Sequence, residues 1–344
     1  MGKRGVLMMN LGTPDEPTTE SVRIYLREFL LDPDVIDIPA PLRHLLVRGI
    51  ILRTRPQKIA PKYGSIWMEE GSPLRVYTHR MTKALESSMD HILCEVGMRY
   101  GRPSIRSGLE KLKESGVDEL LLAPLFPHHA QATTGSSLKH AYKQLKAMNW
   151  NPSIQELPHF PSDPAFIEPL ANSIRPHLAD GTHLLFSYHG LPISHVKRSD
   201  TSGNHCQKID SCCSIGVEGN AMCYAHHCML TTLSVVGALG IDELDWSISY
   251  QSRLGPAKWL QPSTTEVVEN LAKNGKTKVA IVSPAFLADG LETLEELNIK
   301  IREHFIAHGG QELTVVNCLN DDPSWIKGLV HLVENAFSKT MPTS

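Results

Sequence analysis

Short apolar runs alternate with amphipathic segments along most of the chain, and this alternation is the strongest constraint on its fold. The apolar runs have the length of buried strands. The segments between them repeat apolar residues every three or four positions, which is typical of helices. Strands separated by helices predict parallel β-α-β units. We expect strands at 5–11, 91–97, 120–126, 153–157, 184–188, 246–250, 279–283 and 313–317.

The chain is too long for one hydrophobic core. At 344 residues it exceeds the usual size of a single domain, so two domains are expected. The second half repeats the strand and helix rhythm of the first, and a proline-rich stretch at 158–164 lies between them. The sequence therefore predicts two similar α/β domains, 1–160 and 161–344.

Composition excludes several classes of protein. With 34 basic and 37 acidic residues the net charge is −3, which argues against non-specific nucleic-acid binding. No apolar run is long enough for a membrane-spanning helix, and no signal-peptide pattern opens the sequence, so a cytoplasmic protein is expected. The phosphate-binding motifs GxxxxGK[ST] and GxGxxG are missing, so nucleotide binding is disfavoured.

A histidine stands at the end of one expected strand. His189 follows the apolar run 184–188 and precedes Gly190, Leu191 and Pro192. Ligands of open α/β sheets bind beyond the carboxyl ends of the strands. His189 is therefore a candidate ligand or base, with a purely structural histidine as the alternative.

A row of carboxylates follows another expected strand, 279–283. Glu292 and Glu296 are four residues apart on one helix face, and Asp289 lies near the start of that helix. Such a row can bind a cation or pass protons. The alternative is a set of helix-terminal charges in water.

Five of the seven cysteines fall within 23 residues. Clustering of this kind in a cytoplasmic chain indicates metal binding or redox chemistry. Four thiolates suit a [2Fe–2S] cluster or a structural zinc, and a group of ordinary thiols is the alternative. The five are Cys206, Cys212, Cys213, Cys223 and Cys228.

The segment 32–73 interrupts the alternation. Its centre, 41–53, mixes leucine, isoleucine and valine with arginine and histidine. One interpretation is a core helix with a solvated face. The other is an apolar lip beside a site, or a surface that touches a membrane.

Motifs along nearly the whole chain resemble the ferrochelatase family, whose members insert Fe²⁺ into a porphyrin. The resemblance depends on their number and order rather than on any one of them. They are VLMMNLGTP at 6–14, GSPL at 71–74, MRY at 98–100, TTGSS at 133–137, FSYHGLP at 186–192, YQSRLGP at 250–256, WLQP at 259–262 and LETLEE at 291–296.

The resemblance implies a fold and a site. The fold would be two Rossmann-like domains, each a parallel four-stranded sheet flanked by helices, with the porphyrin in a cleft between them. His189 and Glu292 would be the catalytic residues that meet the substrate Fe²⁺, and Asp289 and Glu296 would form an acidic relay. A lip at about 33–73 would cover the cleft mouth. The porphyrin would be bound by Arg99, Tyr100 and Trp259.

The cysteine-rich segment resembles an insertion in those bacterial ferrochelatases that carry a [2Fe–2S] cluster. Four of its five cysteines would be ligands. Cys228 is the weakest candidate, because it aligns with a cysteine of relatives that lack a cluster. Adjacent Cys212 and Cys213 would serve different irons.

The expected function is insertion of Fe²⁺ into protoporphyrin IX to form protohaem, the last step of haem biosynthesis. One alternative is a ferrochelatase that uses coproporphyrin. Another is a non-catalytic iron–sulfur sensor on the same fold. Contact with the inner membrane is expected to be peripheral at most, and the oligomeric state is left open.

Overall fold

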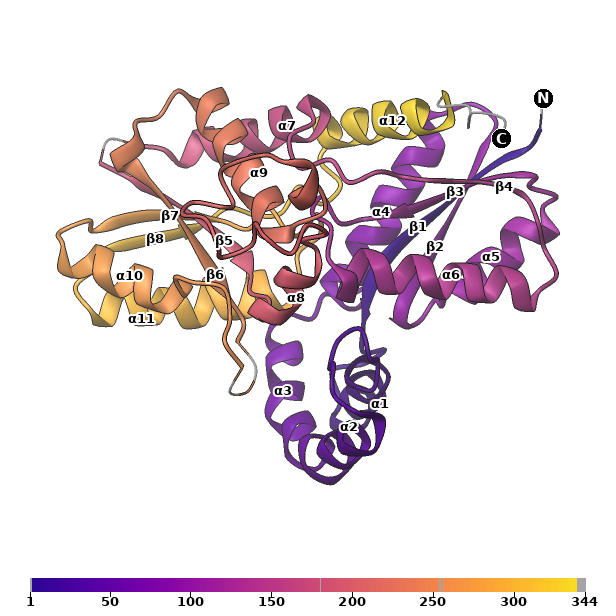
Figure 1. The fold of residues 1–344 in the computed structure, drawn as a ribbon, viewed down its shortest axis with the longest axis horizontal. Helices are drawn as coiled ribbons and strands as arrows, with labels where there is room; N and C mark the ends of the chain where they lie inside the picture. The colour runs from indigo at the N-terminus through magenta and orange to yellow at the C-terminus, as the bar shows by residue number, and fades with distance from the viewer. Residues whose placement is uncertain (1, 180, 254, 256, 339–344) are drawn as a thin grey trace. The chain divides into compact units, whose positions relative to one another are not determined.

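The structure, a computed structural model, describes residues 2–179, 181–253, 255 and 257–338, which divide into two compact units (Figure 1). Unit 1 comprises 1–126, 131–158 and 320–344, and unit 2 comprises 127–130 and 159–319. The expected single boundary at 160 lies close to the observed change at 158. The C-terminal segment, however, returns to unit 1 instead of completing unit 2.

Unit 1 is built on a parallel sheet of four strands in the order β2-β1-β3-β4. Strand β1 is central, and its residues Val6, Leu7, Met8 and Met9 are fully buried. A parallel strand covered on both faces needs such a continuous apolar run. The strands are β1 (Arg4–Thr13), β2 (Ile92–Gly101), β3 (Glu119–Pro124) and β4 (Ser153–Glu156).

Helices cover this sheet and close its core. Leu109 and Leu112 of one helix pack with Leu7 and Leu122 of the sheet. The C-terminal helix α12 contacts α4 and the strands β3 and β4, which explains why it belongs to unit 1. These helices are α4 (Pro73–Ser88), α5 (Ile105–Glu114), α6 (Ser136–Ala147), which follows the π-turn η2 (Gln131–Gly135), and α12 (Pro323–Ser338).

A helical group lies between β1 and α4 in the chain. It consists of α1 (Thr19–Leu30), α2 (Ala40–Leu46), the π-helical turn η1 (Val47–Ile51) and α3 (Leu52–Ile66). Leu42, Leu45 and Ile50 are 56%, 67% and 61% exposed. A core helix would bury these side chains, so that interpretation of 41–53 is wrong for them, and the segment presents an apolar surface instead.

Unit 2 repeats the plan with a parallel sheet in the order β6-β5-β7-β8. Leu185 and Ile281 of the sheet pack with Val268, Leu297 and Phe305 of the covering helices. The strands are β5 (His183–His189), β6 (Trp246–Gln251), β7 (Lys278–Val282) and β8 (Glu312–Val315). The helices are α7 (Pro164–Ile174), η3 (Arg175–His177), α8 (Ile193–Arg198), η4 (Glu218–Asn220), α9 (Tyr224–Leu239), η5 (Glu243–Asp245), α10 (Thr264–Lys273), η6 (Glu292–Ile301) and α11 (Arg302–Ala307).

The predicted fold class is confirmed, since each unit holds a parallel four-stranded sheet flanked by helices. All eight expected strands overlap observed ones. Within the described part of the chain, no helix is both long and apolar enough to cross a membrane.

Candidate active site

His189 is the last residue of β5, at the carboxyl edge of the unit 2 sheet. It pairs in register with Gln251 of β6, and the next residue, Gly190, donates its N–H to the Gln251 carbonyl at 2.8 Å. The Tyr224 hydroxyl donates to the His189 carbonyl at 2.9 Å. These backbone contacts fix the position of the His189 main chain, from which the imidazole projects. The Phe286 ring lies edge-on to the imidazole, with the ring centroids 6.1 Å apart.

The imidazole of His189 is held in its neutral form. Burial lowers its pKa below the usual value, while the negative charge of Glu296 acts in the opposite direction without cancelling the effect. A neutral imidazole near pH 7 has a lone pair that can take a proton or bind a metal ion.

Glu292 begins the π-helix η6, which continues into α11. Burial raises the pKa of its carboxyl to about 7, and the charges of Glu296 and Glu295 add to this effect. A carboxyl with this pKa exchanges protons readily at neutral pH. π-Helical turns are rare and occur frequently at functional sites.

The other two acids are fixed by hydroxyl and backbone donors. Glu296 accepts hydrogen bonds from the N–H and the hydroxyl of Ser252, the first at 3.0 Å. Asp289 is buried and accepts from the Thr293 hydroxyl at 2.8 Å and from the Cys318 N–H at 3.3 Å. The row is therefore built into the fold and is not a set of helix-terminal charges in water. Glu296 acts electrostatically on both His189 and Glu292.

Trp259 lies beside the turn that follows His189. It forms an isolated bridge with Pro192, and its ring is so close to Gly190 that an added Cβ there would meet it at 3.5 Å. Its indole N–H is buried without a partner among the described residues. An unpartnered donor next to His189 is available to a ligand.

Arg99 and Tyr100 lie at the end of β2 in unit 1, where both contact Asp32. The Tyr100 hydroxyl donates to Asp32 at 2.8 Å, as does Ser136, and Arg99 forms an ion pair with the same carboxylate. Burial alone would raise the pKa of Asp32, but these bonds and the Asp34 N–H lower it. Tyr100 is 1% exposed, and its hydroxyl is bonded to Asp32.

The clustered cysteines act on one another electrostatically. Burial first, and then repulsion from neighbouring thiolates, raises the pKa of Cys206 to about 11 and that of Cys213 to about 12. The Sγ atoms of Cys212 and Cys213 lie 3.9 Å apart. Two thiolates on one tetrahedral metal with 2.3 Å bonds are about 3.8 Å apart, so the spacing of Cys212 and Cys213 fits a single iron as well as the two different irons that we expect. Cys228 is fully buried within α9, where the charges of Cys223 and Cys213 also act on it.

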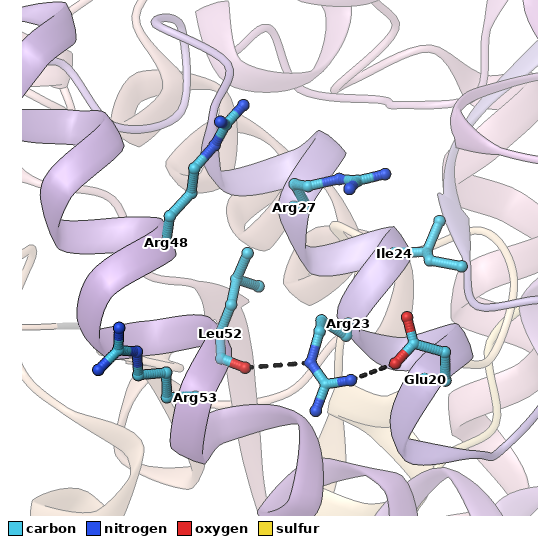
Figure 2. A pocket seen from close by; sticks show the side chains of 7 residues that line it. All are labelled: Glu20, Arg23, Ile24, Arg27, Arg48, Leu52 and Arg53. Atoms are coloured by element: carbon cyan, nitrogen blue, oxygen red, sulfur yellow. Dashed lines mark hydrogen bonds and ion pairs between the residues drawn. The ribbon is translucent and has the colours of Figure 1, made fainter.

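A pocket of about 360 Å³ lies in unit 1 between α1 and the segment η1–α3. Four arginines line it together with Glu20, Ile24 and Leu52 (Figure 2). Arg23 is paired with Glu20 and also donates to the Leu52 carbonyl at 3.3 Å. The other three, Arg27, Arg48 and Arg53, have no acidic partner among the residues that the structure describes.

Some functional residues could not be found from the sequence. Ser252 and Thr293 hold the acidic row, but neither carried a signal beyond its nearness to a motif. Ser252 is 44 residues from Glu296, so only the folded chain brings them together. The spacing of four between Asp289 and Thr293 was the one available hint.

Two units, each with a parallel four-stranded sheet flanked by helices, define an α/β protein whose fold is shared by solved chelatases. The sirohydrochlorin chelatase SirB from Bacillus subtilis subspecies spizizenii, in complex with cobalt, has a TM-score of 0.52. The match is 10% identical and covers 98% of this chain and 97% of that one.

Sequence relatives define the family. The ferrochelatase profile matches residues 3–337. A ferrochelatase of Pseudomonas fluorescens is 42% identical, covering 98% of this chain and 99% of that protein. A ferrochelatase of Bdellovibrio bacteriovorus is 40% identical, covering 97% and 100%. The chain belongs to the ferrochelatase family, enzymes that insert iron into a porphyrin.

Proposed function

We propose that this chain inserts Fe²⁺ into protoporphyrin IX with His189 as the base and Glu292 as the acidic partner. The observation that carries this assignment is that a buried, neutral imidazole and a buried carboxyl of pKa about 7 are both acted on by the charge of Glu296. Metal insertion releases two pyrrole protons, and these two groups are the ones poised to accept them at neutral pH.

The chemistry divides among these side chains. The neutral imidazole of His189 takes a proton from a pyrrole N–H. Glu292 receives Fe²⁺ or the second proton, and Glu296 and Asp289 carry protons away. Binding the rest of the macrocycle can supply a few kcal/mol of ring distortion, which exposes the nitrogen lone pairs. Trp259, through its free indole N–H, and Arg99 are the porphyrin contacts that we propose, and Tyr100 positions Arg99 through Asp32.

An anaerobic assay of the purified protein tests the function. Fe²⁺ is supplied with protoporphyrin IX or with coproporphyrin III, and metal insertion is followed by absorbance. We expect faster insertion into protoporphyrin. Preference for coproporphyrin would keep the mechanism and change the substrate. A folded protein that inserts iron into neither would support the iron–sulfur sensor instead.

We further propose that Cys206, Cys212, Cys213 and Cys223 hold a [2Fe–2S] cluster. Raised thiol pKa values show that thiolate charge is costly there, and a bound metal offsets that cost. The cluster would supply redox-active iron. We propose that its role in this segment is structural. Iron and sulfide analysis tests the ligand set. Serine at any of the four should abolish the visible absorbance, whereas Cys228→Ser and the control Cys94→Ser should retain it.

The exposed leucines of α2 and the arginine pocket suggest where the protein meets a membrane. We propose that Leu42 and Leu45 enter the interface while Arg27 and Arg48 bind anionic headgroups. Cosedimentation with phosphatidylglycerol vesicles should exceed that with phosphatidylcholine and should weaken with salt. Leu45→Asp should reduce it, and Leu244→Asp, at an 85% exposed position of unit 2, should not. Equal binding to both vesicles would exclude the arginine contribution.

A further inference from the structure

Two histidines and a glutamate meet on the outer helices of unit 2. Glu269 lies on α10, and His304 and His308 lie one turn apart at the end of α11, which packs beside α10 (Figure 1). Each of the three side chains is about 30% exposed, so an ion can reach them from solvent. His304 lies twelve positions after Glu292, about three turns further along the same continuous helix, which keeps this group apart from the candidate active site.

The spacing of the three groups matches a metal site. One ligand atom from each lies within 4.8 Å of the others. The Glu269 carboxylate is 3.4 Å from Nε2 of His304 and 3.9 Å from Nε2 of His308. Nitrogen and oxygen ligands of a tetrahedral ion with bonds of 2.0–2.1 Å are about 3.4 Å apart. Only a small side-chain movement would complete the geometry.

The tautomer of His308 strengthens this interpretation. Its Nδ1 lies 2.8 Å from the His304 carbonyl, which can only accept a hydrogen bond, so Nδ1 carries the proton. Nε2 then faces the Glu269 carboxylate, 3.9 Å from Oε2, and is the ring atom that would bind a metal ion. Metal-binding histidines usually donate a hydrogen bond from the ring nitrogen that does not bind the metal, as Nδ1 of His308 does here.

The second carboxylate oxygen of Glu269 is occupied by a cation of the protein itself. Lys273 donates to Oε1 at 2.5 Å, while both histidines face Oε2. The ammonium therefore orients the carboxylate without filling the position between the histidines. It also withdraws charge from the site, so its removal should strengthen metal binding.

We propose that Glu269, His304 and His308 form a binding site for a borderline divalent cation such as Zn²⁺, with a water molecule in the fourth position. Imidazole and carboxylate ligands suit Zn²⁺ and the neighbouring transition metals better than Mg²⁺ or Ca²⁺. A bound ion clamps α10 to α11, so it also stabilises unit 2 against unfolding.

Zn²⁺ binding to the whole protein, measured by competition with a chromophoric chelator, tests the proposal. The variant His304→Gln/His308→Gln should bind one equivalent less than wild type, and the control His331→Gln, at a histidine of α12, should bind as wild type does. Lys273→Met should tighten that equivalent by about threefold to tenfold. Iron insertion should be unchanged in all of them, because these residues lie outside the candidate active site.

Crystals soaked in Zn²⁺ give the location directly. We expect an anomalous peak about 2.0–2.2 Å from both Nε2 atoms and from Oε2 of Glu269. This measurement uses wild-type protein and is decisive even if the double variant fails to fold. An undiminished number of equivalents in a folded double variant, or no anomalous peak between the histidines, would overturn the proposal.

Discussion

At the scale of single residues, burial shifts the pKa values of the two candidate catalytic groups, His189 and Glu292, in opposite directions. The same burial that keeps His189 neutral raises the pKa of Glu292, because in each case the charged form is disfavoured. The positions of both residues after strand ends made them visible in the sequence. Their supporting hydroxyls were not visible, because Ser252 reaches Glu296 only through the fold.

Glu292→Gln should raise stability and flatten the pH dependence of the rate. The folded pKa of about 7 exceeds the usual 4.5, so the carboxyl favours folding fully below pH 4.5 and loses that contribution as pH rises through 7. At pH 8 the variant should unfold with a free energy about 2 kcal/mol higher than wild type, and the gain should shrink toward pH 5.

Urea titrations at both pH values check the stability, and kcat/KM from pH 6 to 8 checks the rate. In wild type kcat/KM should rise through about pH 7 as Glu292 ionises. The control Glu303→Gln, at an exposed position of α11, should leave both profiles unchanged. A stability gain independent of pH would contradict the assigned pKa.

At the scale of elements, the strands were predictable and the π-helices were not. Buried parallel strands require continuous apolar runs, and these stand out in any sequence. A helix that carries Glu292 and Glu296 was also predicted, but its π-helical part, 292–301, shares the apolar spacing of an α-helix. Whether π-helical or α-helical hydrogen bonds form there depends on contacts with the rest of unit 2, and the local sequence does not distinguish the two.

Gly190→Ala should disturb the end of β5. An added Cβ would lie 2.7 Å from the Gln251 carbonyl oxygen, which belongs to the backbone and cannot turn away. We expect a loss of about 1–3 kcal/mol in unfolding free energy and a fall in iron insertion, since His189 is the preceding residue. Gly237→Ala in α9, where the added Cβ meets open space, should be neutral or slightly stabilising. Thermal unfolding of both variants distinguishes the two outcomes, and equal stability would refute the steric argument.

At the scale of the whole molecule, the doubled α/β plan was predictable from length and rhythm. The return of α12 to unit 1 was not, because its amphipathic pattern predicts a helix but does not indicate which element it packs against. Trp325 shows what the partner contributes: it is fully buried, and its indole N–H lies 3.4 Å from the Met81 sulfur of α4.

Trp325→Ala should therefore lower the unfolding free energy by about 3–5 kcal/mol through the cavity it leaves. Denaturant unfolding followed by circular dichroism measures this change. The exposed control Lys327→Ala, on the same helix, should change stability by less than about 0.5 kcal/mol. A small effect at Trp325 would show that α12 is not part of the core of unit 1.

The most direct test of the mechanism is the fate of iron insertion in His189→Ala, measured beside porphyrin binding. Loss of a positioned base should slow Fe²⁺ insertion about 10²- to 10⁴-fold, while fluorescence titration should show protoporphyrin still bound within a few-fold of wild-type affinity. That result would place His189 at the proton-transfer step. Turnover close to wild type in a folded variant with bound porphyrin would contradict the account and transfer the base role to Glu292.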